Sequence, residues 1–293
     1  MKESRSYATA RAFRVALETR LKNIADSEGI DLQRVRRMVA FDRLLARLFF
    51  RSHPPWVLKG GYALELRNRQ ARTTKDIDLV IEHPGNLPNA ELPVNLRVRE
   101  ELQEHVTEDT GDHFVFLIGE PVTDINAAPY GGARYPVRAQ IDGRDFVRFH
   151  IDVGVGDIVM EPVESVDGND WLDFAGIQPP VISVLSKEQQ FAEKLHAYTL
   201  PHKERPNSRV KDLLDMVMLF KSGDMDLTYL RASIDVTFER RKTHDLHIPV
   251  PPPPEHWRPI FKHLADESGL PDDIDTAFTA LSGFVEDILP SLP

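Results

Sequence analysis

Two aspartates separated by a single residue, Asp76 and Asp78, stand at the start of an apolar run that ends at Ile81. The run predicts a buried β-strand, and because strand side chains alternate between faces, residues two apart share one face. Two carboxylates on one face repel each other unless a cation lies between them. Mg²⁺ is usually held by one or two carboxylates together with substrate phosphates, so the pair predicts a Mg²⁺ site, with Mn²⁺ as the alternative ion.

A glycine pair, Gly60 and Gly61, precedes this strand and follows the apolar run 56–58. Without Cβ atoms, the backbone N–H groups of such a pair can approach a phosphate closely, as they do where glycines open a helix. We expect a short helical turn directly after the pair. A glycine pair followed fifteen residues later by two metal-binding carboxylates is the combination needed to bind a nucleoside triphosphate.

This stretch resembles the nucleotide-binding core of the DNA polymerase beta-type nucleotidyltransferases. Within that superfamily it is similar to the AbiEii/AbiGii toxin family, which includes the MenT toxins. The first motif of the family is matched by Lys59, Gly60, Gly61, Asp76 and Asp78. The resemblance implies an α+β fold, in which a nucleotidyltransferase core with a mixed twisted sheet flanked by helices is followed by a mostly helical C-terminal domain.

The dipeptide Asp142-Gly143, which lies between two β-rich runs, predicts a β-hairpin over residues 137–153. Strand alternation places three residues of its second arm on one face, namely Phe146, His150 and Asp152. Enzymes of the polymerase beta type hold two metals with an aspartate pair and one acid from a later strand, and the third acid also accepts a proton from the attacking hydroxyl. The resemblance implies Asp152 for this role, and Asp157 is the alternative.

Ser186 and Gln189 form the capping box of a helix that is expected to reach Thr199. Lys194 lies at the flank of the apolar stripe of this helix. It either extends its stem along the core or places its charge in a site. A second helix is expected to begin at Asn207 or Ser208 and to carry Asp212 and Asp215.

The two helices carry the motifs EKLHA and RVKDLLDM, which are very similar to the AbiEii and MenT toxins. The lysine and the second-domain aspartate that the family requires fall on Lys194 and Asp215. The resemblance gives the lysine a contact with the triphosphate. The expected catalytic residues are Asp76, Asp78, Asp152, Lys194 and Asp215. The expected metal ligands are Asp76, Asp78 and Asp152. The expected nucleotide-binding residues are Lys59, Gly60, Gly61, Lys194, Arg209, Lys211 and Asp212.

Charge and proline content suggest three consecutive parts. Residues 1–52 are expected to form a basic helical extension packed on the core, 53–178 the nucleotidyltransferase core, and 179–293 a helical domain that contributes to the active site. Residues 1–51 hold twelve Lys and Arg against six Asp and Glu, whereas the whole chain has a net charge of −10. A basic end suits a polyanionic substrate. A helix is expected over residues 6–25, stopped by Gly29, and a second is expected to run from an N-cap at Asp31 through Phe50. We expect the arginines of the second helix that lie off its apolar face to approach a phosphate backbone, or else to be only solvated; these are Arg34, Arg37 and Arg43.

The chain has no cysteine, which excludes disulfides, thiol catalysis and cysteine metal sites. Its eleven histidines are scattered and do not support a zinc site. No run approaches eighteen apolar residues and no signal pattern opens the chain, so a cytoplasmic protein without a membrane partner is expected.

The expected function is that of a toxin in a toxin–antitoxin system. The resemblance implies Mg²⁺-dependent transfer of a nucleotide from a nucleoside triphosphate to the 3′ acceptor end of a tRNA, which blocks aminoacylation and translation, and it implies a cognate antitoxin. The alternatives are nucleotidylation or phosphotransfer to another RNA or to a protein, and a catalytically silent nucleotide- or RNA-binding module. The residues do not identify the nucleotide or the tRNA.

Overall fold

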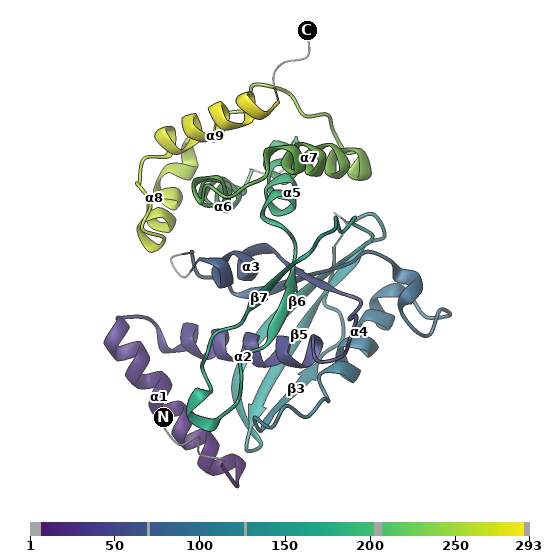
Figure 1. The fold of residues 1–293 in the computed structure, drawn as a ribbon, viewed down its shortest axis with the longest axis vertical. Coiled ribbons are helices and arrows are strands. Elements are labelled where there is room, and N and C mark those ends of the chain that lie inside the picture. Colours follow the sequence, from purple (N-terminus) through teal and green to yellow (C-terminus); the bar gives the residue numbers. More distant parts are fainter. Residues whose placement is uncertain (1–6, 69–70, 126–127, 202–206, 290–293) are drawn as a thin grey trace. The chain divides into compact units, whose positions relative to one another are not determined.

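The computed structural model describes residues 7–68, 71–125, 128–201 and 207–289, which Figure 1 shows as a coloured ribbon. Contacts divide the chain into two compact units that are each discontinuous in sequence. The first unit comprises Met1–Leu58, Lys75–Gly156 and Ser165–Val184, and the second comprises Lys59–Thr74, Asp157–Glu164 and Leu185–Pro293. These units are defined by contacts, so the predicted domain boundaries, which concern consecutive segments, stay a prediction.

The first unit is built on a mixed sheet. Its strands are β1 (Val57–Lys59), β2 (Asp76–Ile81), β3 (Phe114–Ile118), β4 (Thr123–Asp124), β5 (Gly132–Ile141), β6 (Arg144–Val155), β7 (Glu164–Asp167) and β8 (Val181–Val184). Their order is β3-β5-β6-β2-β1-β8-β7, with β4 paired to β5. Strands β2 and β6 are parallel, β1 and β8 are parallel, and β3, β5 and β6 are antiparallel neighbours. The mixed sheet with flanking helices confirms the predicted α+β fold class.

The two faces of this sheet differ in chemistry. Helices α1 (Ala10–Glu28), α2 (Leu32–Leu48) and α4 (Val94–His105) contact its strands. The apolar side chains of one face are buried, and Phe41 of α2 meets Phe149 of β6 edge to face at 4.8 Å. Many alternate positions of the same strands are polar and at least partly exposed, although Val80 at the end of β2 is buried. Strand alternation therefore separates a structural face from a face that can bind a ligand.

The predicted hairpin is present as β5 and β6, but one of its residues faces the other way. A register shift between Ala139 and Gln140 marks a β-bulge opposite Phe146. A bulge adds one residue to a strand and so reverses the alternation beyond it. Phe146 is accordingly buried against Phe114 at 5.2 Å between ring centroids, and the expectation that it shares a face with Asp152 was wrong.

Helices α1 and α2 end and begin at the predicted signals. Gly29, at φ 68°, closes α1, and the Asp31 side chain accepts a hydrogen bond from Arg34 N at 2.9 Å. The helix expected to reach residue 50 ends at Leu48, and Ser6, the expected start of the first helix, lies outside the described residues.

The arginines of α2 correct one expectation. Arg43 is 3% exposed and donates from Nε to Asp112 at 2.6 Å, so it cannot approach an RNA backbone. Arg34 and Arg37 are only partly exposed. Helical periodicity correctly placed Arg43 off the aliphatic stripe of α2. The side chain is nevertheless buried, because it pairs with Asp112 from another segment.

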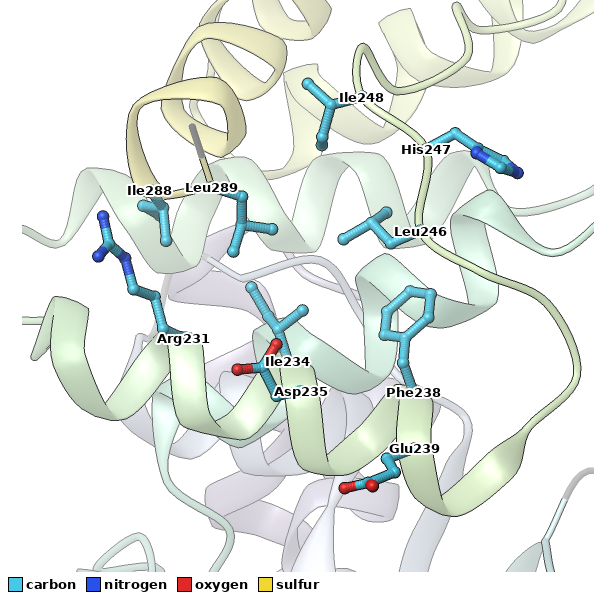
Figure 2. Close-up of a pocket in the computed structure, with 10 residues that line it drawn as sticks. All are labelled: Arg231, Ile234, Asp235, Phe238, Glu239, Leu246, His247, Ile248, Ile288 and Leu289. Atoms are coloured by element: carbon cyan, nitrogen blue, oxygen red, sulfur yellow. The ribbon is translucent and has the colours of Figure 1, made fainter. Parts of the chain in front are cut away.

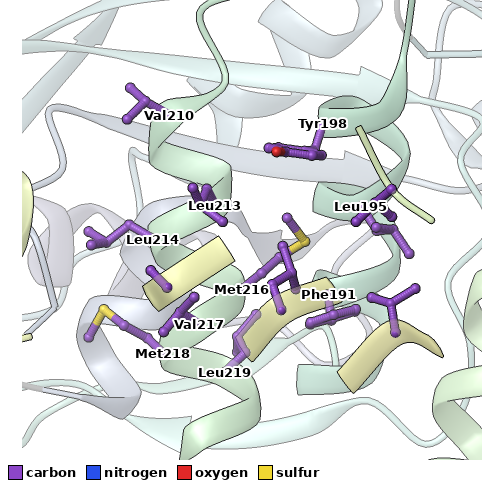
Figure 3. Close-up of a cluster of buried hydrophobic side chains, with 14 of the residues drawn as sticks. Phe191, Leu195, Tyr198, Val210, Leu213, Leu214, Met216, Val217, Met218 and Leu219 are labelled. Carbon is purple, nitrogen blue, oxygen red and sulfur yellow. The ribbon is translucent and has the colours of Figure 1, made fainter. Parts of the chain in front are cut away.

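The second unit is helical in its described residues. It contains α3 (Gly60–Arg67), α5 (Lys187–Thr199), α6 (Val210–Lys221), α7 (Leu227–Arg241), α8 (Arg258–Glu267) and α9 (Ile274–Ile288). Figure 3 shows the apolar side chains of α5 and α6 that form its core, among them Phe191, Leu195, Leu213 and Val217. The predicted N-cap of α5 is confirmed, because Gln189 N donates to Ser186 Oγ at 3.1 Å, but the side-chain amide of Gln189 bonds to Ile158 O and Met160 N and does not complete the capping box.

The start of the C-terminal part differs from the expectation in secondary structure. Residues Val181–Val184, where a helical domain was expected to begin, form strand β8 and pair with β1. Helix α5 begins only at Lys187. The proline-rich linker, residues 244–255, follows α7. It contacts α5 in the second unit, because Tyr198 Oη donates a hydrogen bond to the carbonyl of Pro251 at 2.9 Å. Within the described ranges, no helix combines the length and the apolar character that crossing a bilayer requires.

Candidate active site

Three predicted carboxylates share the polar face of two adjacent strands in the first unit. Asp78 of β2 is the register partner of Asp152 of β6, and Asp76 is the partner of His150. Register partners on parallel strands point to the same side, so Asp76, Asp78 and Asp152 form one carboxylate row. Asp157, the alternative third acid, lies outside this row, in the second unit. The row is the arrangement that the sequence predicted for Asp152.

A cation from the next strand already lies against this row. Arg134 of β5 is the register partner of Asp152 and forms a two-point ion pair with it, at 2.7 Å from Nε and 2.6 Å from Nη2. Its Nη2 also lies 3.4 Å from Asp76. The hydrogen bonds that Arg134 donates to Asp152, and then the charges of Asp152 and Asp76, raise the pKa of the Arg134 guanidinium above its usual value. The row therefore attracts positive charge.

The donor set of the row fits a hard divalent cation. Across the residues that the structure describes, no three acid or histidine side chains are grouped tightly enough to hold a metal by themselves. Mg²⁺ does not need such a cage, because it takes one or two carboxylates and completes its shell with waters and substrate phosphates. The carboxylate row, with Arg134 as the positive charge now beside it, meets that requirement.

The second unit contains the predicted glycine pair at the start of α3. Gly60 has φ 70°, a left-handed conformation that glycine adopts without cost. A Cβ atom at Gly61 would lie 2.8 Å from Thr74 Oγ1 and 3.5 Å from a guanidinium nitrogen of Arg72. A larger residue at this position would therefore require the Thr74 side chain to shift. The N–H groups of a helix N-terminus, with a guanidinium beside them, form a favourable site for a phosphate.

Arg72 belongs to a buried charge cluster that also holds Lys194 and Asp215. Asp215 has no exposed surface; it receives Arg72 Nε at 2.9 Å and Nη2 at 2.7 Å, and Lys194 Nζ at 2.7 Å. Burial alone would lower the pKa of Lys194, but Asp215 and then Asp212 raise it. Burial would likewise raise the pKa of Asp215, and Lys194 and then Arg72 lower it. All three groups are charged at neutral pH.

The cluster separates the roles of its members. Asp215 is enclosed and holds two cations, so it could act on a substrate only through Arg72 and Lys194. Asp212 lies at the edge of the cluster, 3.4 Å from Lys194 Nζ and 3.5 Å from Arg209. Arg209 and Lys211, at the start of α6, are exposed. Lys194, which the sequence left open between packing and chemistry, is buried and ion-paired rather than extended to solvent.

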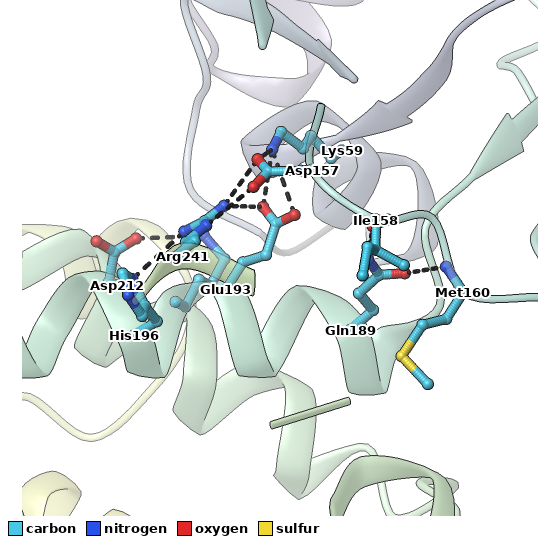
Figure 4. A network of polar contacts seen from close by, with 10 residues as sticks. Lys59, Asp157, Ile158, Met160, Gln189, Glu193, His196, Asp212 and Arg241 are labelled. Carbon is cyan, nitrogen blue, oxygen red and sulfur yellow. Dashed lines mark hydrogen bonds and ion pairs between the residues drawn. The ribbon is translucent and has the colours of Figure 1, made fainter. Parts of the chain in front are cut away.

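Lys59 and Asp157 form a separate network in the second unit, shown in Figure 4. Lys59 Nζ lies 2.9 Å from Glu193 and 3.2 Å from Asp157, and Arg241 donates to both oxygens of Asp157 at 3.0 and 2.9 Å. Burial would lower the pKa of Lys59, whereas Glu193 and then Asp157 raise it. Two cations are thus matched by two acids. This pairing positions the residue directly before the glycine pair.

The large groove shown in Figure 2 is separate from the carboxylate row, the Lys194 cluster and the Lys59 network. It has a volume of about 750 Å³ and is lined by α7, the linker and the end of α9, with Ile234, Phe238 and Ile248 as its apolar surface. None of the predicted site residues lines it. Its apolar walls do not suit a triphosphate.

Comparison with known proteins identifies the family. The sequence profile described as nucleotidyl transferase AbiEii toxin of a type IV toxin–antitoxin system matches residues 43–286, which is most of the chain. The chain belongs to the AbiEii nucleotidyltransferase toxin family. No curated protein sequence matches it.

Two solved structures are similar to this AbiEii-family chain. MenT4, a nucleotidyltransferase toxin from Mycobacterium tuberculosis H37Rv, aligns with a TM-score of 0.57 and 19% identity over 89% of this chain and 85% of its own. JHP933 from Helicobacter pylori aligns with a TM-score of 0.44 and 15% identity over 86% of this chain and 89% of its own. At 19% identity, the similarity to MenT4 supports the fold of this chain and nothing beyond it.

The sequence analysis of this AbiEii-family chain missed four charged residues of these clusters, namely Arg72, Arg134, Glu193 and Arg241. A signal existed for Arg134, because it lies three positions before the predicted first arm of the hairpin, and extending that arm toward the N-terminus places it beside the second arm, which carries Asp152. Glu193 stands inside the EKLHA motif. Arg72 and Arg241 meet their partners across 143 and 84 residues, and no local pattern announces such pairs.

Proposed function

We propose that this AbiEii-family toxin transfers a nucleotide from a nucleoside triphosphate to the 3′ end of a tRNA in a Mg²⁺-dependent reaction. The observation that carries the proposal is the carboxylate row, in which Asp78 and Asp152 are register partners and Asp76 shares their face. Bound Mg²⁺ would neutralise the triphosphate and favour ionisation of the attacking hydroxyl. A tRNA with an added 3′ nucleotide cannot be aminoacylated, so translation and growth would stop.

The reaction has a simple balance. The 3′ oxygen of the RNA bonds to the α-phosphorus, the bond from this phosphorus to the β-phosphate oxygen breaks, and pyrophosphate leaves. The hydroxyl proton passes to the carboxylate of Asp152, the acid of the row that lies on the later strand. Asp152 is ion-paired with Arg134 at 2.6 Å, so proton acceptance requires this pair to open.

The second unit contains groups that by their own chemistry suit a phosphate. Gly60 and Gly61 present backbone N–H groups at the start of α3, and Arg72 lies beside them. Lys194 and Arg72, both held by Asp215, are cations with fixed positions that would orient the triphosphate by charge-assisted hydrogen bonds. Asp212 lies at the border of the same cluster, and Arg209 and Lys211 beside it are exposed.

The family membership supports two partners, a nucleoside triphosphate substrate and a cognate antitoxin. Because the reaction needs a nucleotide pool and tRNA, we place the protein in the cytoplasm.

The test is incubation of the purified protein with total tRNA, Mg²⁺ and each nucleoside triphosphate in turn, labelled in parallel on the α- or the γ-phosphorus. Label from the α-position should enter tRNA, and label from the γ-position should not. Asp78→Ala should abolish the transfer while keeping the thermal midpoint near that of the wild type, because loss of one of two repelling acids relieves strain. Transfer of γ-label would assign a phosphotransferase, and label in protein alone would assign a protein acceptor.

Asp78→Ala also tests the metal. A variant that keeps more than a few per cent of the wild-type activity would remove Asp78 from the metal site. Chelation by EDTA should stop the wild-type reaction, and added Mg²⁺ or Mn²⁺ should restore it.

A further inference from the structure

The polar face of the sheet continues beyond the carboxylate row toward the turn of the β5–β6 hairpin. We call this continuation the hairpin face; its members are Val115 and Leu117 of β3, Arg138 and Gln140 of β5, and Asp145 and Arg148 of β6. Arg138 is the register partner of Arg148 and also of Leu117, and Gln140 is the partner of Val115. The residues therefore form neighbouring rows across three strands.

The hairpin face and the carboxylate row lie on the same side of the same strands. Asp152 and Arg148 are four residues apart on β6, and Arg134 and Arg138 are four residues apart on β5, so each pair shares one face of the sheet. Four residues of a strand span about 13 Å. This length matches the rise of about four stacked nucleotides. A strand of RNA whose 3′ end lies at Asp152 would reach the two arginines with its preceding nucleotides.

The arginines of the hairpin face are exposed and fixed. The side chains of Arg148 and Arg138 are 69% and 46% exposed, and each donates to a different oxygen of Asp145. One acid thus holds two cations, and the group keeps a net positive charge. Between Gly132 and Arg148 the chain has four arginines against two aspartates, although its net charge is −10. Two arginines directly opposite each other on paired strands destabilise a sheet, so a fold gains nothing from this pairing by itself.

Apolar side chains lie next to these charges. Val115 is 53% exposed and Leu117 is 44% exposed, both on β3 at the edge of the sheet. Guanidinium planes and apolar side chains beside phosphate-binding charges suit single-stranded RNA, because its bases are unpaired and free to contact the protein.

We propose that the hairpin face binds the single-stranded 3′ segment of the acceptor RNA and directs its terminal hydroxyl to the carboxylate row. Arg138 and Arg148 contact phosphates, and Val115 and Leu117 contact the ribose or base of the same nucleotides. This inference rests on the proposed function, and it replaces the α2 arginines as the site of RNA contact. It also assigns the determinant of acceptor choice to an unpaired end rather than to a duplex.

The test compares two RNAs and two matched variants by fluorescence anisotropy. The RNAs are a tRNA acceptor-stem hairpin with its single-stranded 3′ end and the same hairpin with a blunt end. Arg138→Gln with Arg148→Gln is compared with Arg51→Gln with Arg258→Gln, because Arg51 and Arg258 are also exposed and ion-paired, at 41% and 44% exposure. The wild type should prefer the RNA with the single-stranded end.

The first double variant should bind that RNA about 10-fold more weakly and lose up to about two units of salt slope, one for each lost phosphate contact. Its affinity for the blunt hairpin should stay near that of the wild type, and the control variant should match the wild type with both RNAs. Leu117→Glu, at an exposed position that leaves the core intact, should weaken the same RNA specifically because it adds a negative charge beside the phosphates.

The outcomes separate this inference from the proposed function. If the wild type labels tRNA but both hairpin-face variants bind the single-stranded end as tightly as the wild type, the surface is wrong and the function stands. If the wild type transfers no nucleotide but its RNA binding depends on Arg138 and Arg148, the function is wrong and the surface stands. Unchanged RNA binding combined with altered self-association in gel filtration would assign the face to a protein contact and overturn the inference.

Discussion

The first unit contains the same charged triad twice, once closed and once open. In the closed triad, Asp112 joins Arg43 and Arg47, and all three side chains are less than 5% exposed. In the open triad, Asp145 joins Arg138 and Arg148, and the side chains are 35% to 69% exposed. Each consists of two guanidinium groups that share one carboxylate. The two triads contain the same charged groups and differ only in how far those groups are buried.

Burial changes what the triad does. Asp112 accepts hydrogen bonds from both arginines, from Thr110 Oγ1 and from Phe114 N, so its charge is fully satisfied. Burial alone would raise its pKa, but Arg47 and then Arg43 lower it to about 2. The closed triad has no capacity left for a ligand and fixes α2 to the segment before β3. The open triad can exchange its partners with solvent or phosphate, so equal charges serve structure in one place and binding in the other.

The largest effect is expected from Asp112→Asn. The substitution keeps the shape of the side chain but leaves two buried guanidinium groups without a counter-charge, which costs about 3 to 5 kcal/mol of unfolding free energy. Urea denaturation monitored by circular dichroism measures this loss. A cost below about 1 kcal/mol would mean that water reaches the closed triad and that its burial does not distinguish it from the open one.

The next effect concerns Lys194, whose cluster is also mostly buried, with side chains that are at most 10% exposed at Lys194, Arg72 and Asp215, but is proposed to bind a substrate. Lys194→Met keeps the unbranched stem and removes the charge. The protein should fold, because Asp215 keeps both hydrogen bonds from Arg72. Nucleotide transfer should fall by the equivalent of about 2 to 5 kcal/mol, because a desolvated charge-assisted contact is lost.

Transfer rates and thermal midpoints measured together decide the role of Lys194. Growth inhibition in the host should disappear with the transfer activity. Near-normal transfer by a well-folded Lys194→Met protein would show that Lys194, like Arg43, serves the fold alone.

The sequence predicted what depends on neighbouring residues. The shared face of Asp76 and Asp78 follows from strand alternation, the turn of the β5–β6 hairpin follows from Asp142-Gly143, and the caps at Asp31 and Ser186 follow from a spacing of three residues, whereas the place of Asp152 beside the pair was implied by the family resemblance. Each of these signals acts within a few positions of the chain, so periodicity and turn chemistry contain it.

Pairs between distant segments escaped the prediction. Helical periodicity placed Arg43 off the aliphatic stripe of its helix, which is correct, but the partner that buries it lies 69 residues away. Phe146 turned inward because of one inserted residue in a strand, and the bulge depends on the pairing of both arms. Arg72 meets Asp215 across 143 residues. The physical reason is common to all three: burial and register are properties of two segments, and one segment does not encode them.

A smaller effect is expected when the closed triad is titrated. The pKa of Asp112 is lowered from 3.8 to about 2 on folding, so its stabilisation is fully present above about pH 4 and is lost as the pH falls through about 2. The loss corresponds to about 2 kcal/mol. It appears as a shrinking difference in unfolding free energy between the wild type and Asp112→Asn over this range. A difference that stays constant from pH 5 to pH 2 would show that Asp112 is not ionised more easily in the folded state.

The smallest effect on stability is expected from Asp145→Asn, the same substitution in the open triad. Exposed ion pairs contribute little to folding, so the thermal midpoint should stay within about 2 °C of the wild type. RNA binding should respond in the opposite sense, because two arginines that lose their shared carboxylate have more positive charge to offer a phosphate. We expect the acceptor hairpin with a single-stranded end to bind several-fold more tightly at low salt, with little change for the blunt hairpin. A midpoint lowered as far as in Asp112→Asn would make the open triad structural, and an unchanged affinity would show that Asp145 does not compete with RNA for the arginines.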